Sequence, residues 1–365
     1  MPDPSGQSGA LRIIDANLNR AREALRVMED YARFILDDDA LSGALKDERH
    51  ALTADVPPGV ARRLTASRDT ARDVGRTRTA GGECHRPGAA DVALAGGRRL
   101  AEALRAIEEY AKTLDVAWAL RVERMRYRGY HLDQRLRLHA RARERFGSVR
   151  LYVLITESMC RGDWLQTAEA ALRGGADALQ LRETGLSDRD LAQRASRLAR
   201  CCRDHDALLI VNDRPDIALI SGAAGVHLGT ADLTVADARR ILPDSAVVGV
   251  STHTIQQVQG AVADAPDYIA VGPMFPTTTK PQSRVAGPET LAAARALTSL
   301  PLVAIGGIDV DTAADVLSAA PCGLAVCRAV IAQPDVRAAA AALRTLIDRH
   351  ADARPTEETR PAARN

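Results

Sequence analysis

Residues 177–182 read DALQLR and residues 207–212 read ALLIVN, and the amphipathic stretch 187–203 lies between them. Nearly continuous apolar runs of this length are typical of parallel strands that are covered on both faces. An amphipathic segment between two such runs predicts a helix that returns the chain to the same end of the sheet. This strand–helix–strand unit decides the fold class of the region, which is α/β.

The same alternation continues through the last two-thirds of the chain. Eight strands that alternate with helices over a region of this size predict a closed barrel. An open doubly wound sheet is the alternative, but no Gly-rich dinucleotide loop follows the first strand. The other strands are predicted over 150–155, 225–228, 246–251, 267–272, 301–305 and 323–327, and the other helices over 163–173, 214–221, 234–242, 254–263, 288–297 and 310–318.

The amino-terminal third contains a duplicated helical unit. The stretch EALRVMEDYAR at 23–33 recurs as EALRAIEEYAK at 102–112, and LKDER at 45–49 recurs as LRVER at 120–124. Apolar residues in both copies follow three- and four-residue steps, which place them on one face of a helix. The sequence therefore predicts an all-α helical-repeat domain before the barrel.

Composition between these periodic stretches sets the expected boundaries. Residues 56–98 are rich in Gly, Pro, Arg and Thr and are expected to form loops, and a third long helix is predicted over 116–145. We expect a disordered amino terminus at 1–10, a duplicated helical domain at 11–147, a barrel domain at 148–350 and a disordered tail at 351–365.

Charge and cysteine content narrow the function class. The 365-residue chain has a formal net charge of +2, so no overall field favours nucleic acid as a partner. Its six cysteines form no Cys-x-x-Cys pair, which is typical of reduced thiols. No secretion signal or membrane span is visible in the sequence. We therefore expect a cytoplasmic protein without membrane or nucleic-acid partners, and a homo-oligomer is left open.

Two carboxylates follow neighbouring strands of the predicted barrel. Asp213 comes after the third strand and Asp232 after the fourth, and the carboxyl ends of barrel strands share one rim. A pair of carboxylates with substrate phosphate and water suits Mg²⁺. The alternative for each residue is a helix cap, before Pro215 and before the 234–242 helix respectively.

Cationic and hydroxyl groups also follow predicted strands. The Arg182 guanidinium can form a bidentate interaction with a phosphate, and Gln180 lies two residues earlier on the same strand face. A buried structural ion pair is the alternative for Arg182, and a merely polar loop is the alternative for Lys280. His227 is expected to be a packed core histidine. The loop around Lys280, with Thr277, Thr278 and Thr279, suits anion capture. Gly306 and Gly307, with Cys327 and Arg328, lie at the usual phosphate site of such barrels.

Together these residues predict two anion sites, a metal-assisted diphosphate site around strands two to four and a monophosphate site at strands seven and eight. They indicate departure of a diphosphate that is assisted by charge neutralisation. No Ser-His-Asp set, metal-binding His cluster or Schiff-base lysine at a strand end stands out in the sequence. Covalent catalysis is therefore not expected.

With these motifs in their order and spacing, residues 150–345 resemble the thiamine-phosphate synthases. The motifs are QLRE at 180–183, VND at 211–213, GVHLG at 225–229, GVS at 249–251, GP at 272–273 with PTTTK at 276–280, and AIGGI at 304–308. The resemblance implies a (β/α)8 TIM barrel and a transferase. Such an enzyme condenses 4-amino-2-methyl-5-hydroxymethylpyrimidine diphosphate with a (carboxy)thiazole ethyl phosphate and releases pyrophosphate through a pyrimidinyl-methyl cation.

The resemblance also implies roles for individual residues. It makes Arg182, Ser251 and Lys280 catalytic, and it makes Asp213 and Asp232 ligands of Mg²⁺. Pyrimidine-diphosphate contacts would come from Gln180, Arg182, Asn212, Ser251 and Lys280, thiazole-phosphate contacts from Thr277, Thr279, Gly307, Cys327 and Arg328, and the substrate-binding set also includes Leu181, Glu183, Thr184 and Thr278.

Two positions depart from the family pattern. The family usually has Lys where this chain has Thr184, and Ser where it has Arg328. We hypothesise that the charge of Arg328 partly replaces that of the missing lysine. A thiazole tautomerase-like barrel and a non-catalytic sensor of thiamine precursors are the alternative functions.

The helical repeat resembles a domain that is found fused to such synthases and for which hydroxymethylpyrimidine-phosphate kinase activity has been proposed. No P-loop is visible in it. Arg22, Arg26 and Arg68 form a candidate anion pocket between the repeats, and a solvated helix face is the alternative.

Overall fold

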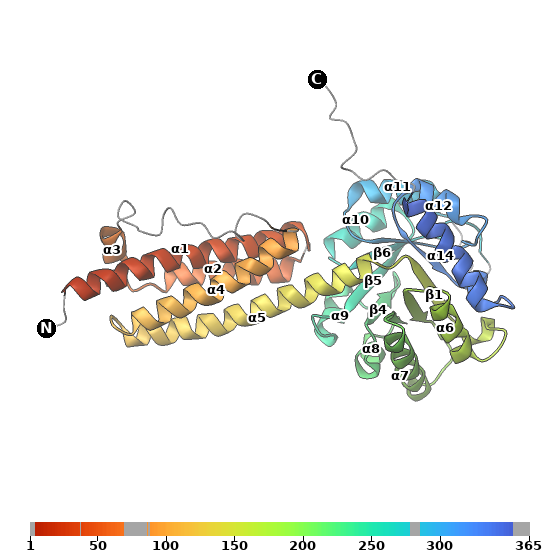
Figure 1. The fold of residues 1–365 in the computed structure, drawn as a ribbon, viewed down its shortest axis with the longest axis horizontal. Coiled ribbons are helices and arrows are strands. Elements are labelled where there is room, and N and C mark those ends of the chain that lie inside the picture. Colours follow the sequence, from red (N-terminus) through yellow and green to blue (C-terminus); the bar gives the residue numbers. More distant parts are fainter. Residues whose placement is uncertain (1–3, 37, 69–85, 87, 278–284, 353–365) are drawn as a thin grey trace, which may run out of the picture. The chain divides into compact units, whose positions relative to one another are not determined.

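A computed structural model describes residues 4–36, 38–68, 86, 88–277 and 285–352. The chain divides into two compact units, Met1–Ala140 and Arg141–Asn365, which are considered separately. Figure 1 shows a helical first unit and a second unit built of strands and helices. The division falls inside the helix that ends at Gly147, seven residues before the expected boundary.

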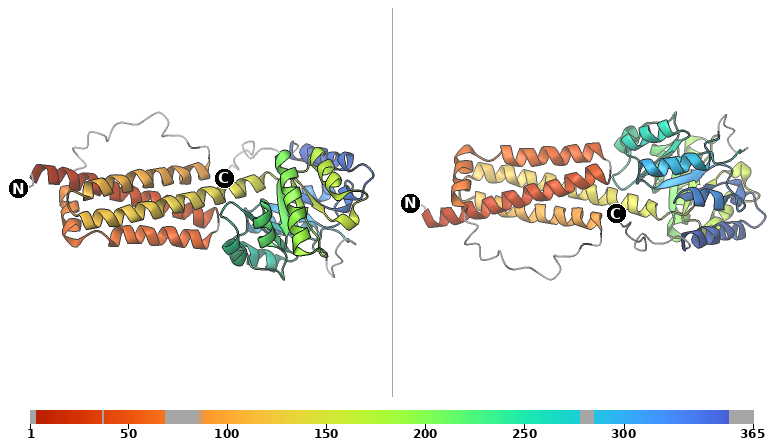
Figure 2. Two further views of the ribbon diagram at one scale, coloured as in Figure 1. Left: turned by 90° about the horizontal axis from the view of Figure 1, so that it is seen from below. Right: turned by 90° about the horizontal axis from the view of Figure 1, so that it is seen from above.

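The first unit is a bundle of long helices that run side by side (Figure 2). The first helix packs against both the second and the fourth. Leu25 and Met28 of one sequence copy and Leu104 and Ile107 of the other lie in one buried apolar cluster. The duplicated apolar stripe therefore forms a shared core. The helices are α1 (Pro4–Phe34), α2 (Asp39–Ala54), α3 (Pro58–Ser67), α4 (Ala89–Ala111) and α5 (Val116–Gly147).

Two expectations about this unit are wrong. Residues 1–10 were expected to be disordered, but α1 begins at Pro4, and Ala10 is buried, so the apolar stripe extends further back than predicted. The range 56–98 was expected to form loops, but it contains α3 and the start of α4. Proline at the first turn is compatible with a helix, which explains α3. Residues 69–85 lie outside the described part of the chain.

The second unit confirms the predicted barrel. In its described residues eight parallel strands close in sequence order, and β1 pairs with β8. Every strand lies within one residue of its predicted limits. The strands are β1 (Leu151–Ile155), β2 (Ala178–Leu181), β3 (Leu208–Asn212), β4 (Gly225–Leu228), β5 (Val247–Thr252), β6 (Tyr268–Val271), β7 (Leu302–Ile305) and β8 (Gly323–Val326).

Helices cover the outside of this barrel (Figure 1). Leu179 and Leu209 point outward and share an apolar cluster with helix residues, whereas Tyr152, Leu208 and Tyr268 belong to a second cluster inside the barrel. The described helices after β1 are a 3-10 turn η1 (Glu157–Met159), then α6 (Trp164–Arg173), α7 (Asp188–Asp204), α8 (Pro215–Ser221), α9 (Val235–Ile241), α10 (Ile255–Ala263), α11 (Gly287–Leu297), α12 (Ala313–Ala319), α13 (Arg328–Ile331) and α14 (Val336–Asp352).

An aromatic side chain fills the interior near the beginning of the strands. Phe146, from the end of α5, stacks on Tyr268 with ring centroids 3.8 Å apart. The core therefore reaches below the strands and leaves the carboxyl ends of β1–β8, here called the rim, for polar groups. The tail expected at 351–365 overlaps α14 by two residues, and 353–365 lie outside the described residues. Among the described helices none has the length and apolarity to cross a membrane.

Candidate active site

The two predicted metal-binding aspartates lie at neighbouring points of the rim. The Asp213 amide, directly after β3, donates to the His227 carbonyl in β4 at 2.8 Å. Asp232 folds back onto the end of β4, where its Oδ2 accepts from the Gly229 amide at 2.7 Å. The register pairs Asn212 with His227, so both carboxylates belong to the same edge of the barrel.

Neither aspartate caps the helix that follows it. The residue that caps α8 is Arg214, which makes no side-chain capping bond, and the residue that caps α9 is Thr234, whose hydroxyl accepts from the Asp237 amide. The capping alternative is therefore wrong for both. Asp213 also has a φ of 63°, in the left-handed region that few non-glycine residues adopt. Strained positions of this kind concentrate at functional sites.

Inside the barrel, four hydrogen bonds join five side chains from five strands. Gln180 Nε2 donates to the Tyr152 hydroxyl at 2.8 Å, and that hydroxyl lies 3.2 Å from the hydroxyl of Tyr268. The Tyr268 hydroxyl lies 2.8 Å from His227 Nδ1, and His227 Nε2 lies 2.8 Å from Ser251 Oγ. We call this set the interior chain. It connects Gln180 and Ser251, two predicted substrate contacts on different strands.

Sequence reasoning missed the interior chain. His227 is buried, as expected, but it bridges two polar groups and does not pack only against apolar ones. Burial raises the pKa of Tyr152 and of Tyr268 well above the ordinary tyrosine value, so both keep their protons. The sequence did contain a signal, namely the alternation of side chains between the two faces of each strand. By this alternation Gln180, His227 and both tyrosines point to the inside of the barrel.

Residues 181–184, at the end of β2, lie in three different environments. Leu181 is 1% exposed and its side chain lies in the outer cluster with the helices, so only its backbone is available to a ligand. The Glu183 carboxylate accepts hydrogen bonds from Arg194 of α7 at 3.0 Å and from the Glu157 amide of η1. These bonds hold the loop after β2 against both elements. Arg182 is half-buried and shares the strand face of Gln180, and Thr184 is exposed.

Two glycines bring the loops after β6 and β7 together. Gly306 and Gly307 have φ values of 96° and 70°, and a side chain on Gly307 would collide with Phe275. The Phe275 amide donates to the Gly306 carbonyl at 3.0 Å. Thr277, two residues further on, is therefore held near Gly307. The predicted contacts Thr278, Thr279 and Lys280 lie outside the described residues.

Cys327, at the end of β8, is influenced by the charges of two arginines. Burial raises the pKa of its thiol to about 11, while the charges of Arg182 and Arg328 act in the opposite direction. Its Sγ lies 3.7 Å from the sulfur of Met159. The thiol is therefore protonated at neutral pH and poorly suited to be a nucleophile. Arg182 follows β2 and Arg328 follows β8, and β1 lies between these two strands in the barrel.

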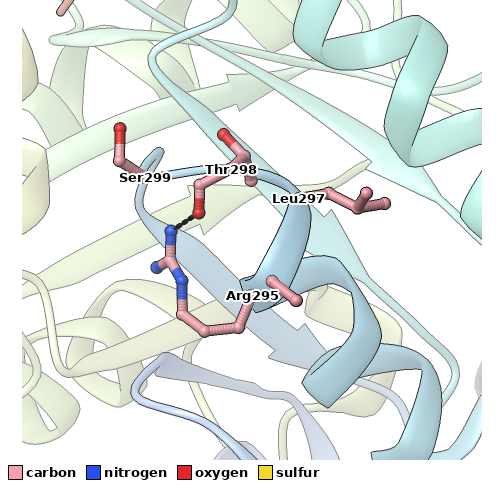
Figure 3. Close-up of a pocket in the computed structure, with 5 residues that line it drawn as sticks. Arg295, Leu297, Thr298 and Ser299 are labelled. Atoms are coloured by element: carbon pink, nitrogen blue, oxygen red, sulfur yellow. Dashed lines mark hydrogen bonds between the residues drawn. The ribbon is translucent and has the colours of Figure 1, made fainter. Parts of the chain in front are cut away.

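Two surface hollows of the barrel lie away from this rim. Figure 3 shows one of about 550 Å³ beside the end of α11, where Arg295 donates to the Thr298 carbonyl. A cavity of about 450 Å³ is lined by Phe146, by Leu302 at the start of β7 and by Gly323 at the start of β8. Both belong to the amino-terminal end of the barrel, whereas chemistry in such barrels occurs at the opposite end.

In the helical unit, carboxylates neutralise two arginines of the candidate anion pocket. Arg68 forms a bidentate pair with Asp15, with both distances 2.8 Å. Arg26 contacts Glu29 and Asp30. These pairs favour the alternative, a charged helix face with internal ion pairs, over a phosphate-binding site.

Comparisons with known proteins agree with the fold. Residues 151–330 match the Thiamine monophosphate synthase family, and residues 12–135 match the ThiD2 family. The thiamine-phosphate synthase of Synechocystis sp. is 38% identical over 338 residues, 93% of this chain and 96% of that protein. The one from Thermosynechococcus vestitus is 40% identical over 90% of this chain and 92% of that protein.

A solved structure also matches the second unit. The thiamine phosphate pyrophosphorylase from Pyrococcus furiosus superposes with a TM-score of 0.53 at 34% identity, over 57% of this chain and 98% of that one. The curated relatives, in contrast, match along nearly the full length of both chains. The chain therefore belongs to the thiamine-phosphate synthase family, whose members are transferases of thiamine biosynthesis.

Proposed function

We propose that the barrel joins 4-amino-2-methyl-5-hydroxymethylpyrimidine diphosphate to a (carboxy)thiazole ethyl phosphate and releases pyrophosphate. The observation that supports this most is the position of Asp213 and Asp232 at the ends of two paired strands. The substrates are small molecules. A cytoplasmic location and a homo-oligomeric state stay predictions.

The carboxylates fit a magnesium ion that is held jointly by protein and substrate. Among the described residues no group of three or more His, Cys, Asp or Glu side chains gathers around one point. Magnesium commonly uses only one or two carboxylates and completes its shell with phosphate oxygens and water. Asp213 and Asp232 supply this donor set. When bound, the ion would neutralise charge on the departing diphosphate.

The side chains around the acids have complementary tasks. Arg182 is a planar, permanently charged group that can hold two diphosphate oxygens, and Asn212, which ends β3 beside Asp213, can donate an amide hydrogen. Ser251 and Gln180 face the pyrimidine ring from β5 and β2. Lys280 adds a second cation to the diphosphate. Holding charge in place as the C–O bond breaks lowers the barrier without a covalent intermediate.

The thiazole phosphate is assigned to the other side of the rim. Gly307 offers a backbone amide, and Thr277 and Thr279 offer hydroxyl groups. Cys327 and Arg328 lie where such barrels commonly bind phosphate, after the last two strands. The two substrates would thus meet across the barrel mouth, with the thiazole nitrogen aimed at the pyrimidine methylene.

One assay separates this function from its alternatives. The protein is mixed with both substrates, with either one alone, and with or without Mg²⁺, and pyrophosphate is measured. We expect pyrophosphate only when both substrates and Mg²⁺ are present. A tautomerase would isomerise the thiazole without pyrophosphate, and a sensor would bind precursors without turnover, so either result would contradict the proposal.

A second activity is proposed for the helical unit, on the basis of its match to the ThiD2 family. It would phosphorylate hydroxymethylpyrimidine phosphate and so supply the diphosphate that the barrel consumes. The full chain is incubated with ATP, the pyrimidine monophosphate and the thiazole phosphate. Thiamine phosphate forms only if the unit is a kinase, and its absence, with the synthase step intact, would rule the kinase out.

A further inference from the structure

We propose that the interior chain fixes which groups of Gln180 and Ser251 donate and which accept hydrogen bonds from a ligand. It thereby selects a pyrimidine with an amino donor over one with an oxo acceptor. The inference rests on the proposed function, because it concerns how that site reads its pyrimidine. The residues that carry it, Tyr152, His227 and Tyr268, are buried and act as positioning residues through Gln180 and Ser251.

The direction of the chain is set at its Gln180 end. An amide nitrogen only donates, so Gln180 Nε2 makes the Tyr152 hydroxyl an acceptor. With its oxygen accepting from Gln180, the Tyr152 hydroxyl can direct its own proton to the Tyr268 oxygen 3.2 Å away, and Tyr268 can then direct its proton to His227 Nδ1 at 2.8 Å. A neutral imidazole with Nδ1 as acceptor carries its proton on Nε2 and donates to Ser251 Oγ.

With this direction of the hydrogen bonds, the two ends of the interior chain present one acceptor and one donor to a ligand. The carbonyl oxygen of Gln180 is the end of the amide that does not face Tyr152, so it offers an acceptor. The Ser251 hydroxyl, which already accepts from His227, offers its own proton. A 4-aminopyrimidine has the complementary groups, because its amino group donates and its ring nitrogens accept.

The coupling excludes the oxo analogue. To donate to a 4-oxo group, the Gln180 amide would have to turn over, and Tyr152 would then donate to its carbonyl. Every bond down the chain would reverse, and the Ser251 proton would point at His227. The 4-oxo ring carries a proton on N3 but keeps N1 as an acceptor. With Ser251 placed at N1, the ring would lose its donor there, so a gain at one end is a loss at the other.

The chain is also held firmly in place. A side chain on Gly249 of β5 would lie about 2 Å from the Tyr268 ring, so glycine is what lets this ring reach His227. Phe146 stacks on the opposite part of the same ring. Gln180, Tyr152, His227 and Tyr268 are all less than 10% exposed, which keeps water from substituting for a missing partner.

The test compares kcat/KM for the 4-amino and 4-oxo pyrimidine diphosphates in the full-length protein. Tyr268→Phe cuts the chain at its centre, and Tyr152→Phe cuts it beside Gln180, and both keep the rings. We expect a wild-type preference for the amino substrate of about a hundredfold or more, and a loss of at least about tenfold in this preference in each variant.

Thr252→Val is the matched control. Thr252 is a buried hydroxyl on the same strand as Ser251, but it donates to the Ala270 carbonyl outside the interior chain. Its preference ratio should equal that of the wild type. An unchanged ratio in both tyrosine variants, with both substrates slowed equally, would overturn the proposal and leave the synthase assignment standing. If one variant does not fold, the other decides.

A second readout does not need turnover. ¹⁵N spectra of histidine-labelled protein, assigned with His227→Gln, report which ring nitrogen of His227 carries the proton. We expect the neutral Nε2–H form in the wild type and a shift toward Nδ1–H in Tyr268→Phe. An Nδ1–H wild type would overturn the inference, whereas absence of pyrophosphate release from wild-type protein would count against the proposed function.

Discussion

Asp213 combines two properties in one residue. Its left-handed backbone is better tolerated by Asp and Asn than by other residues with a side chain, and its amide fastens the end of β3 to β4. An asparagine at this position should keep the conformation and remove only the charge. The position thus allows a charge test with little structural side effect.

Substitution of Arg328 tests whether its charge replaces that of the lysine that the family usually has at the position of Thr184. Arg182 follows β2 and Arg328 follows β8, with only β1 between these strands at the rim, whereas Thr184 is exposed and uncharged. We expect Arg328→Ser to raise the KM for at least one phosphorylated substrate by roughly tenfold or more, since a charge-assisted bond contributes about 1.5–3 kcal/mol. Steady-state kinetics with each substrate varied in turn would measure it.

The control for this prediction restores the family residue. Thr184→Lys in the Arg328→Ser background should recover much of the lost affinity if the two cations do the same work. Unchanged substrate affinities in Arg328→Ser would refute the compensation hypothesis.

Sequence alone placed some site residues well and others poorly. The rim position of Asp213 and Asp232 follows from strand order, which apolar runs reveal. Leu181 and Glu183 were included as members of the motif at 180–183 that carries the resemblance. Alternation along the strand turns the Leu181 side chain outward. Glu183 pairs with Arg194 from α7, a tertiary contact that no local pattern shows.

At the scale of elements, the beginning of α2 depends on Asp38. This residue caps the helix by accepting from the Leu41 amide and contacts His139 in α5 at 3.1 Å. Burial alone would raise the pKa of Asp38, but the bonds from His139 and Leu41 outweigh it and lower the pKa below the usual range. A lowered folded pKa stabilises the fold above the unfolded pKa, and this is lost as pH falls below about 4.

We therefore expect Asp38→Ala to reduce the free energy of unfolding by about 1–2 kcal/mol at pH 7. The difference from wild type should narrow as the pH falls below about 4. Urea denaturation at several pH values would measure both effects. Asp39→Ala removes the exposed neighbouring carboxylate and should change little. A difference that grew toward acid pH would contradict the assignment of Asp38.

Secondary structure was more predictable in the barrel than in the bundle. Barrel strands are buried on both faces, so their apolar runs are continuous and stand out. The helix α3 has only two buried residues, Val60 and Leu64, which is too short a stripe to recognise in a polar stretch. The start of α1 was missed because Gly and Pro near the terminus suggested disorder.

At the scale of the whole molecule, the two units have separate apolar clusters. Leu25 is fully buried in the cluster of the helical unit. We expect Leu25→Ala to destabilise that unit by about 2–5 kcal/mol and to leave the unfolding transition of the barrel where it was. Differential scanning calorimetry would resolve the two transitions. A single transition that moved as a whole would show that the units unfold together.

The account depends most on Asp213 and Asp232 serving one magnesium ion. Its most direct test is the initial rate of pyrophosphate release as a function of Mg²⁺ concentration in wild type, Asp213→Asn and Asp232→Asn. Asp216→Asn, in the exposed ion pair with Arg214, is the control. We predict that both rim variants lose roughly hundredfold in rate and need more Mg²⁺, while the control matches wild type. Rim variants with the wild-type rate and magnesium dependence would contradict the account.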